Sequence, residues 1–515
     1  MKILQWLSLI LGFTCMAHGC HVSPEPTAAA KVIFRYNEPQ GIQSLDPTDA
    51  LHLAHLRATS MLTETLVKPD GTPGLASSWS ADERKMRWYF TLRSGVLFHP
   101  NASGISDTLS SNDVLASFQR LKTKPRAAWI LHPVAEMKVE TDSTLIFELN
   151  EPDAMFYLRL ATPLTGILSQ RQILENPSTI VSHPLGTGPF SLLKWVPEQR
   201  LILANFSSYW QGKVGCDRVA VYFLKDAQTA FLEFLAGRLE VLLGIQPAYR
   251  DRLLDGTGQL RTEYSKDFIF QKFPFYNTEY LGFRVKATDH PLAKYSALRR
   301  AYAFALDRQA LIRELRANVG TVAQQGMIPE VLRPFPSEFT YDFYPDSVLP
   351  LLQSCGFAKP EDVPLLTLYT DPAYTDIATA IVGQWRNFGL ACKTEVVDRA
   401  TLKSGIANGR YTCFRASWIA DYPDPRNYYQ LFYGPLETPN GPNYTQWNQP
   451  NFNKAFEAFS RNPDEKTMVS MEKSLYMDMP VIPLWYDQQV IFYRKNGVKP
   501  SLWPNGAWNW DELSH

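Results

Sequence analysis

The chain has 515 residues, more than one hydrophobic core normally supports, so we expect two or three domains. Apolar residues make up 45% and charged residues 20%, which is typical of a globular protein. The 51 Lys and Arg residues balance the 51 Asp and Glu residues, which argues against a nucleic-acid-binding protein because such proteins carry a basic surface.

The first 19 residues predict a secretory signal peptide. Lys2 precedes a mostly apolar run over residues 3–17, too short for a mature membrane helix. Residues 17–20, AHGC, resemble the lipobox at which bacterial signal peptidase cleaves and the Cys is lipidated, although the Ala and the His are atypical. We therefore expect a lipid anchor at Cys20 and a Pro/Ala-rich tether over residues 20–30. No later segment has enough consecutive apolar residues for a membrane helix.

Strand-like and helix-like segments alternate along the first half of the chain. Residues 31–47 predict a strand leading into a loop, and residues 49–67 a helix. Residues 86–100 predict a pair of strands, 110–123 a helix begun by Ser110 with Asp113 as its capping partner, 138–150 a strand, and 153–169 a helix. Residues 186–210 predict two strands joined by a turn at 196–198, and residues 219–244 a strand, a helix and a strand.

The second half continues the alternation. Residues 280–285 predict a strand, 290–315 a long amphipathic helical region broken near Asp307, and 363–397 another strand, helix and strand. Strands are also expected at 411–418 and 480–498. This order predicts α/β domains with mixed sheets, built from segments that are discontinuous in the sequence.

Several kinds of catalytic or cofactor site find little support. The sequence contains no GxSxG, HExxH or phosphate-loop motif. Gly186-Thr187-Gly188 is followed by Pro189 and a strand, so it lacks the context of a dinucleotide loop. His52 and His55 could share a metal only with partners that are not visible nearby, so helix packing or solvent contact is favoured.

Four cysteines remain after the signal peptide and Cys20, and none has a zinc-site spacing. One disulfide is possible in an oxidising compartment, joining Cys355 to Cys392 or to Cys413. The sequence does not choose between these pairings.

Residues 417–429, SWIADYPDPRNYY, hold two carboxylates on a loop. Pro423 and Pro425 forbid a regular helix or a central strand there. The preceding segment is a predicted strand, so Asp421 would emerge at the end of a strand, where open α/β sheets form ligand crevices. Asp424, directly before a proline, is expected to set the turn. Asp421 is the better candidate for a ligand contact.

Five stretches, in order, resemble the peptide-binding solute-binding proteins of ABC importers. They are residues 44–50, residues 74–100 with 109–121, residues 186–210, residues 280–285 with 298–312, and residues 443–459 with 479–486. The resemblance covers roughly residues 30 to 500. It implies an α/β, bilobal periplasmic-binding-protein-like fold, with two α/β lobes joined by hinge strands and a small extra domain on the first lobe.

The same resemblance implies domain boundaries. We expect a signal peptide over 1–19, the tether over 20–30, and a first lobe made of 31–67, 185–279 and 487–515. The small extra domain would span 68–184 and the second lobe 280–486. The hinge strands should lie near 280–285 and 484–488.

The family binds its ligand's amine with an Asp in a stretch of the form RAGWxADY, which here reads RASWIADY over residues 415–422. Asp421 is the matching residue, and a fixed carboxylate can hold a desolvated ammonium without reordering. Arg415 would stand where some members pair a peptide's C-terminal carboxylate. Ser417 replaces the usual Gly, which could narrow the groove. The expected ligand-binding set is Asp421, Arg415, Ser417, Trp418, Tyr422, Ala50 and Leu51.

The implied function is an extracytoplasmic receptor, not an enzyme, that captures oligopeptides by hinge closure and delivers them to ABC permease subunits. We expect a lipid-anchored monomer in the periplasm or on the outer face of the cytoplasmic membrane, without a metal, a cofactor or nucleic acid. The alternatives are a related receptor for murein peptides or a metal complex, and a secreted hydrolase. The hydrolase is disfavoured because the spacing of Asp421 and Asp424 on a proline-restricted loop gives no reason for both to face one bond.

Overall fold

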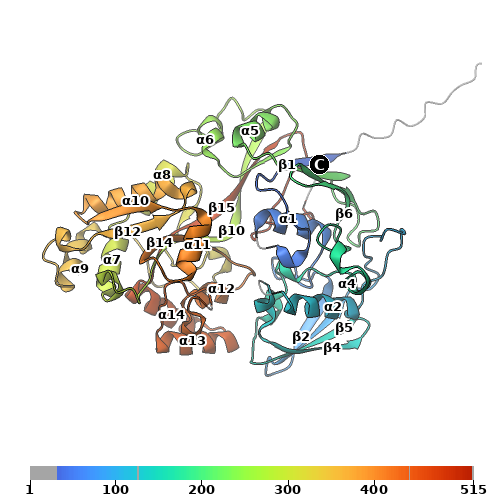
Figure 1. Ribbon diagram of the computed structural model, residues 1–515, viewed down its shortest axis with the longest axis horizontal. Coiled ribbons are helices and arrows are strands. Elements are labelled where there is room, and N and C mark those ends of the chain that lie inside the picture. Colours follow the sequence, from blue (N-terminus) through green and yellow to red (C-terminus); the bar gives the residue numbers. More distant parts are fainter. Residues whose placement is uncertain (1–31, 51, 125–126, 440, 513–515) are drawn as a thin grey trace, which may run out of the picture.

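The computed structural model describes residues 32–50, 52–124, 127–439 and 441–512. Figure 1 shows two lobes connected by a ribbon of two long strands, β10 and β15. Lobe I, on the right, contains both ends of the described chain and two separate sheets. Lobe II, on the left, is built from the segment between the two long strands.

The main sheet of lobe I has the strand order β1-β8-β7-β6. Its strands are β1 (Ile33–Asn37), β6 (Phe190–Val196), β7 (Arg200–Asn205) and β8 (Arg218–Tyr222), and β1 runs parallel to β8. The predicted strand pair over 186–210 is confirmed as the antiparallel hairpin β6–β7. Helix α1 (Leu53–Leu62) lies within the segment predicted to be helical. Phe34 and Tyr36 of β1 pack against Trp508 and Trp510 near the end of the chain.

The second sheet of lobe I, here called the small sheet, has the order β2-β3-β5-β4 and is fully antiparallel. Its strands are β2 (Ala76–Ala81), β3 (Arg87–Leu92), β4 (Val134–Thr141) and β5 (Thr144–Leu149). Helix α2 (Ser111–Lys122) begins with the predicted capping box, in which the Ser110 amide donates to Asp113 Oδ2 at 2.8 Å. The segment 138–150, predicted as one strand, is the β4–β5 hairpin.

Two further predictions near the small sheet were wrong. Residues 86–100 form one strand, β3, whose hairpin partner is β2; beyond it the chain turns at Gly95, which has a positive φ, and Leu97 bridges Thr108 instead. Residues 153–169 form only the short helix α3 (Phe156–Arg159) and a 3-10 turn. Pro163 explains the second error, because proline lacks an amide hydrogen and disfavours helical geometry in the residue before it.

The central sheet has the order β11-β15-β10-β14-β12-β13 and is mixed, because β12 runs parallel to both of its neighbours. Its strands are β10 (Phe268–Phe283), β11 (Thr321–Val322), β12 (Leu366–Thr370), β13 (Cys392–Val396), β14 (Cys413–Ile419) and β15 (Val481–Arg494). The predicted strand, helix and strand over 363–397 is confirmed as β12, α10 and β13.

The helices of lobe II cover this sheet and extend below it (Figure 1). They are α7 (Ser296–Phe304), α8 (Arg308–Leu315), α9 (Val348–Ser354), α10 (Thr375–Asn387), α11 (Arg399–Ala407), α12 (Arg426–Tyr429), α13 (Pro450–Arg461) and α14 (Glu465–Asp478). The predicted break near Asp307 is confirmed: this residue caps α8 by accepting the Ala310 amide at 2.9 Å. The remaining helices are α4 (Gln170–Glu175), α5 (Ala227–Leu235) and α6 (Pro247–Leu253), all in lobe I.

Strands β10 and β15 pair with each other on both sides of the passage between the lobes. Residues 268–274 pair with 488–494 beside β9 (Val241–Leu243) of lobe I, and residues 278–282 pair with 481–486 beside β14 of lobe II. The register shifts between Pro274 and Thr278. The strands expected at 280–285 and 484–488 fall within or at the end of these two longer strands.

The possible disulfide between Cys355 and Cys392 or Cys413 is absent. The four described cysteines are free and buried. Cys392 and Cys413 lie on β13 and β14, which are separated by β12. The side chains of Cys355, Cys392 and Cys413 all belong to the apolar core of lobe II. Among the described residues, no helix is both long and apolar enough to cross a bilayer.

Candidate functional site

The loop that follows β14 carries the main candidate residue. β14 ends at Ile419, and the chain cannot become helical until it has passed Pro423 and Pro425. Asn427, in the first turn of α12, fixes the loop: its Oδ1 accepts the Asp421 amide at 3.3 Å and the Trp418 indole at 2.8 Å. The predicted strand, rigid loop and emerging carboxylate are therefore present.

The carboxylate of Asp421 has a weak set of partners. Its Oδ2 accepts one long hydrogen bond, from Asn427 Nδ2 at 3.4 Å, and it takes part in none of the ion pairs among the described residues. Burial raises the pKa of Asp421 to about 6, and the bond from Asn427 offsets only part of this rise. Asp421 is half-buried, and a fixed, partly desolvated carboxylate without a cation is suited to a cationic group of a ligand.

Asp424 behaves differently, although it lies on the same loop. Its Oδ1 accepts the Arg426 amide at 2.8 Å and its Oδ2 accepts Arg426 Nε at 2.7 Å. The prediction that Asp424 sets the turn is confirmed. Because this carboxylate is already neutralised, the loop holds one uncompensated anion and not an acid pair.

Arg415 lies on β14, in a buried group of charges. Its guanidinium pairs with Glu279 of β10, lies 3.6 Å from Asp371 after β12, and stacks 3.1 Å from the ring centroid of Tyr374. Arg415 was predicted to receive a ligand carboxylate, but here two carboxylates of the protein already balance its charge. The sequence analysis missed Glu279, although an acidic residue directly before the apolar strand predicted at 280–285 was a usable signal.

Strand β14 has a free edge beside Asp421. It pairs with β10 from Cys413 to Ile419, but with β12 only at Cys413 and Phe414. Beyond Phe414 the second edge has no strand partner among the residues that the structure describes. Ser417 lies on this stretch, exposed, and opposite Glu279 in the β10 register. An extended peptide could add to such an edge as a further strand.

The other predicted site residues have mixed surroundings. Trp418 is half-buried and donates to Asn427. Tyr422 is buried and faces lobe I, with the Arg159 guanidinium 5.1 Å from its ring centroid. Ala50 is buried with the apolar core of the small sheet, and Leu51 lies outside the described residues.

The pair of histidines considered for a metal also has a described environment. His55 Nε2 accepts the Gln43 amide at 3.1 Å and its Nδ1 lies 3.3 Å from the Asp49 carbonyl, so the ring supports the loop before α1. Its ring centroid is 6.1 Å from that of His52. No group of three or more His, Cys, Asp or Glu side chains with the arrangement of a metal site occurs in the described part of the chain.

Comparison with known proteins gives the context of this site. Residues 71–440 match the family described as bacterial extracellular solute-binding proteins, family 5 Middle. The dipeptide-binding protein of Escherichia coli (strain K12) is 23% identical over 434 residues, covering 79% of this chain and 78% of that protein. The periplasmic murein peptide-binding protein of the same organism is 24% identical over 486 residues, covering 86% and 85%.

The fold also matches a solved structure. The ABC transporter-associated periplasmic binding protein of Helicobacter pylori, in complex with the peptide STSA, superposes with a TM-score of 0.74. It is 21% identical in sequence, and the match covers 91% of this chain and 95% of that one. The bilobal α/β fold expected from the sequence is confirmed.

Proposed function

The chain belongs to family 5 of the bacterial extracellular solute-binding proteins, and on this premise we propose that it binds oligopeptides and delivers them to the permease subunits of an ABC transporter. The observation that carries the proposal is Asp421, a half-buried carboxylate without a cation, on a proline-restricted loop beside a free strand edge. A peptide supplies both matching groups, since its N-terminal ammonium can pair with Asp421 and its backbone can pair with β14. Relatives named for dipeptides and for murein peptides support this ligand class.

In this proposal, residues 415–422 have different roles in peptide binding. Asp421 holds the ammonium, and residues 415–419 offer backbone groups to the peptide. The side chain of Ser417 stands where a peptide side chain would pass, so it restricts which residues fit. Arg415 holds Glu279 and Asp371 in place behind the edge and can reach a carboxylate only by exchanging one of these partners.

The mechanism is closure about the β10–β15 ribbon. Lobe II would turn relative to lobe I at the register shift between Pro274 and Thr278, where the ladder of the two strands is interrupted. A peptide that contacts both lobes binds the closed form more tightly than the open form. Peptide binding therefore increases the fraction of molecules that are closed. We place the functional units at the sequence-derived boundaries: the first lobe at 31–67, 185–279 and 487–515, the extra domain at 68–184, and the second lobe at 280–486.

We further propose that the protein works as a monomer outside the cytoplasm, tethered by a lipid on Cys20. Residues 1–31, which include this cysteine, lie outside the described residues. The supporting observation is the sequence itself, with its apolar leader, lipobox-like AHGC and Pro/Ala-rich tether.

The decisive experiment is mass spectrometry of the protein purified under gentle, non-denaturing conditions. We expect intact peptides with free N-termini to be released on unfolding, and synthetic copies of them to raise the unfolding temperature with concentration. Recovery of murein peptides would select that ligand class. Cleaved products, or no peptide in the protein and no stabilisation by any peptide, would contradict the proposal.

A further inference from the structure

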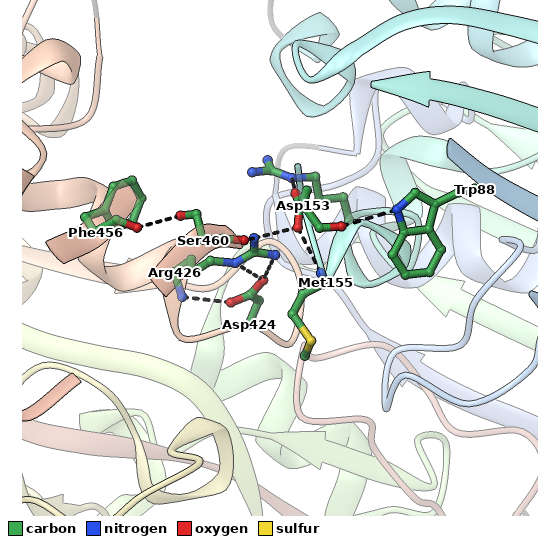
Figure 2. A network of polar contacts seen from close by, with 8 residues as sticks. Trp88, Asp153, Met155, Asp424, Arg426, Phe456 and Ser460 are labelled. Atoms are coloured by element: carbon green, nitrogen blue, oxygen red, sulfur yellow. Dashed lines mark hydrogen bonds and ion pairs between the residues drawn. The ribbon is translucent and has the colours of Figure 1, made fainter. Parts of the chain in front are cut away.

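A buried ion pair joins the two lobes beside the ligand loop. Arg426 of α12, in lobe II, pairs through Nη1 with Asp153 Oδ1 at 2.5 Å. Asp153 follows β5 of the small sheet in lobe I, so the pair spans the space between the lobes (Figure 2). Arg426 is 2% exposed and Asp153 4% exposed. A charge pair this deeply buried forms only when the two lobes meet.

Lobe I holds Asp153 in a fixed position. Its Oδ1 accepts the Met155 amide at 2.9 Å, and its carbonyl accepts the Trp88 indole at 3.2 Å, which ties this loop to β3 (Figure 2). Its other oxygen, Oδ2, pairs with Arg159 Nε at 3.3 Å. Burial raises the pKa of Asp153, but Arg426 and Arg159 outweigh that effect and keep the pKa below its usual value.

Lobe II holds Arg426 equally firmly. Asp424 accepts hydrogen bonds from its backbone amide and from Nε, and the Ser460 carbonyl lies 3.3 Å from Nη1 (Figure 2). Both members of the pair are therefore oriented before they meet, which reduces the entropy lost when the contact forms.

Each member also has an oppositely charged partner within its own lobe. If the lobes separate, Asp153 keeps Arg159 and Arg426 keeps Asp424. Separation of the lobes therefore leaves neither residue without an oppositely charged partner. If the two residues had only each other, separation would leave two unpaired charges. This arrangement allows the contact to break and re-form.

The contact is continuous with the ligand site. Arg426 is followed directly by Asn427, which binds both the backbone amide and the carboxylate of Asp421. Tyr422, next to Asp421, faces lobe I, where the Arg159 guanidinium lies 5.1 Å and the Trp129 ring 6.4 Å from its ring centroid. One short loop therefore carries the proposed ammonium site and reaches across to the other lobe.

We propose that Asp153 and Arg426 form a closing latch, whose contact sets the share of closed molecules and the time for which a ligand stays bound. This inference rests on the proposed closure about the β10–β15 ribbon. Asp153 and Arg426 act as positioning residues: they hold the lobes together around the ligand. The latch slows ligand release more than it speeds capture, because it forms only after the lobes approach.

The test is a measurement of the distance between the lobes in the ligand-free protein. The parent protein carries Cys20→Ser and two spin-labelled cysteines, Ser78→Cys on the small sheet and Lys454→Cys on α13. Both labelled positions are exposed. Asp153→Asn keeps the side chain's shape and removes its charge. We expect this variant to have a larger share of the long, open distance than its parent. The matched control, Glu148→Gln, removes a carboxylate on β5 that pairs only within the small sheet, with Arg87 and Lys138, and should leave the distances unchanged.

A second readout is the peptide dissociation rate in stopped flow. Asp153→Asn should release a bound peptide about tenfold faster with little change in association rate. If Asp153→Asn unfolds, Arg426→Lys, which keeps the charge but loses the forked geometry, should shift the distances in the same direction. Equal open shares in the parent and in the latch variants, or an equal shift in Glu148→Gln, would overturn the latch. Failure of the parent to bind any peptide would instead overturn the proposed function, since the distance measurement needs no ligand.

Discussion

Replacing Asp421 with Asn should stabilise the ligand-free protein against unfolding and should lower its affinity for peptides. Burial raises the pKa of Asp421 from 3.8 to about 6, so the folded protein binds this proton more tightly than the unfolded chain does. Stability therefore falls as the pH rises from about 4 to 6, and above pH 6 the folded state carries the cost of an uncompensated anion. The shift is roughly 2 pKa units, worth about 1 to 3 kcal/mol at neutral pH once partial solvation is allowed for. Asp421→Asn removes this cost.

The same substitution removes the partner of the peptide's ammonium, and we expect free-amine peptides to lose about 2 to 5 kcal/mol of binding free energy. Urea unfolding of the ligand-free protein measures the gain, and calorimetric titration with a free-amine peptide and its N-acetylated form measures the loss. Asp424→Asn is a matched control: its carboxylate is paired with Arg426, so its loss should destabilise the protein. The reasoning fails if Asp421→Asn lowers the stability of the empty protein, or if both peptides weaken equally.

Four further outcomes follow from the same geometry. Peptide affinity should fall by up to about tenfold per pH unit below pH 6, where Asp421 takes up a proton; calorimetry across pH 4.5–7.5 checks this, and an equal fall in Asp421→Asn would contradict it. Ser417→Gly should bind peptides with bulky side chains a few-fold more tightly, at a cost of about 0.5–1 kcal/mol in stability; an unchanged preference across a peptide series would remove Ser417 from the groove. Glu279→Gln should destabilise the protein by about 3 kcal/mol in urea unfolding, since it takes away one of the two carboxylates that neutralise buried Arg415, and a neutral result would show that Asp371 suffices. Cys20→Ser should move the protein from the detergent to the aqueous phase in detergent partitioning, and an unmodified Cys20 in the parent would refute the anchor.

Local patterns in the sequence predicted the parts of the fold that depend on local chemistry. The strand, helix and strand over 219–244 and the break at Asp307 were readable because periodicity and capping act over a few residues. The rigid loop around Asp421 was readable because proline restricts its own backbone and that of its neighbour. The helix expected over 153–169 failed for the same reason, since Pro163 outweighed the apolar spacing.

The charge partners could not be predicted from single segments. Arg415 and Glu279 are 136 residues apart, and Arg426 and Asp153 are 273 residues apart. Such pairs depend on which strands become neighbours and on how two lobes meet, and neither is encoded in the spacing of a short stretch. Sequence reasoning therefore found the unpaired carboxylate of Asp421. It also predicted that Arg415 would be free to bind a ligand carboxylate, whereas in the structure Glu279 and Asp371 balance its charge.

The packing of β1 against the end of the chain has a consequence for biosynthesis. Phe34 and Tyr36 share their core with Ile491, Trp508 and Trp510, so the main sheet of lobe I cannot bury its apolar face until nearly the whole polypeptide has been made. The apolar core of lobe II, by contrast, comes from residues 281–485, a single continuous segment that can fold as a unit. Strand β1 is thus made first but waits longest for its packing partners, so the order of synthesis and the order of packing are opposite in lobe I.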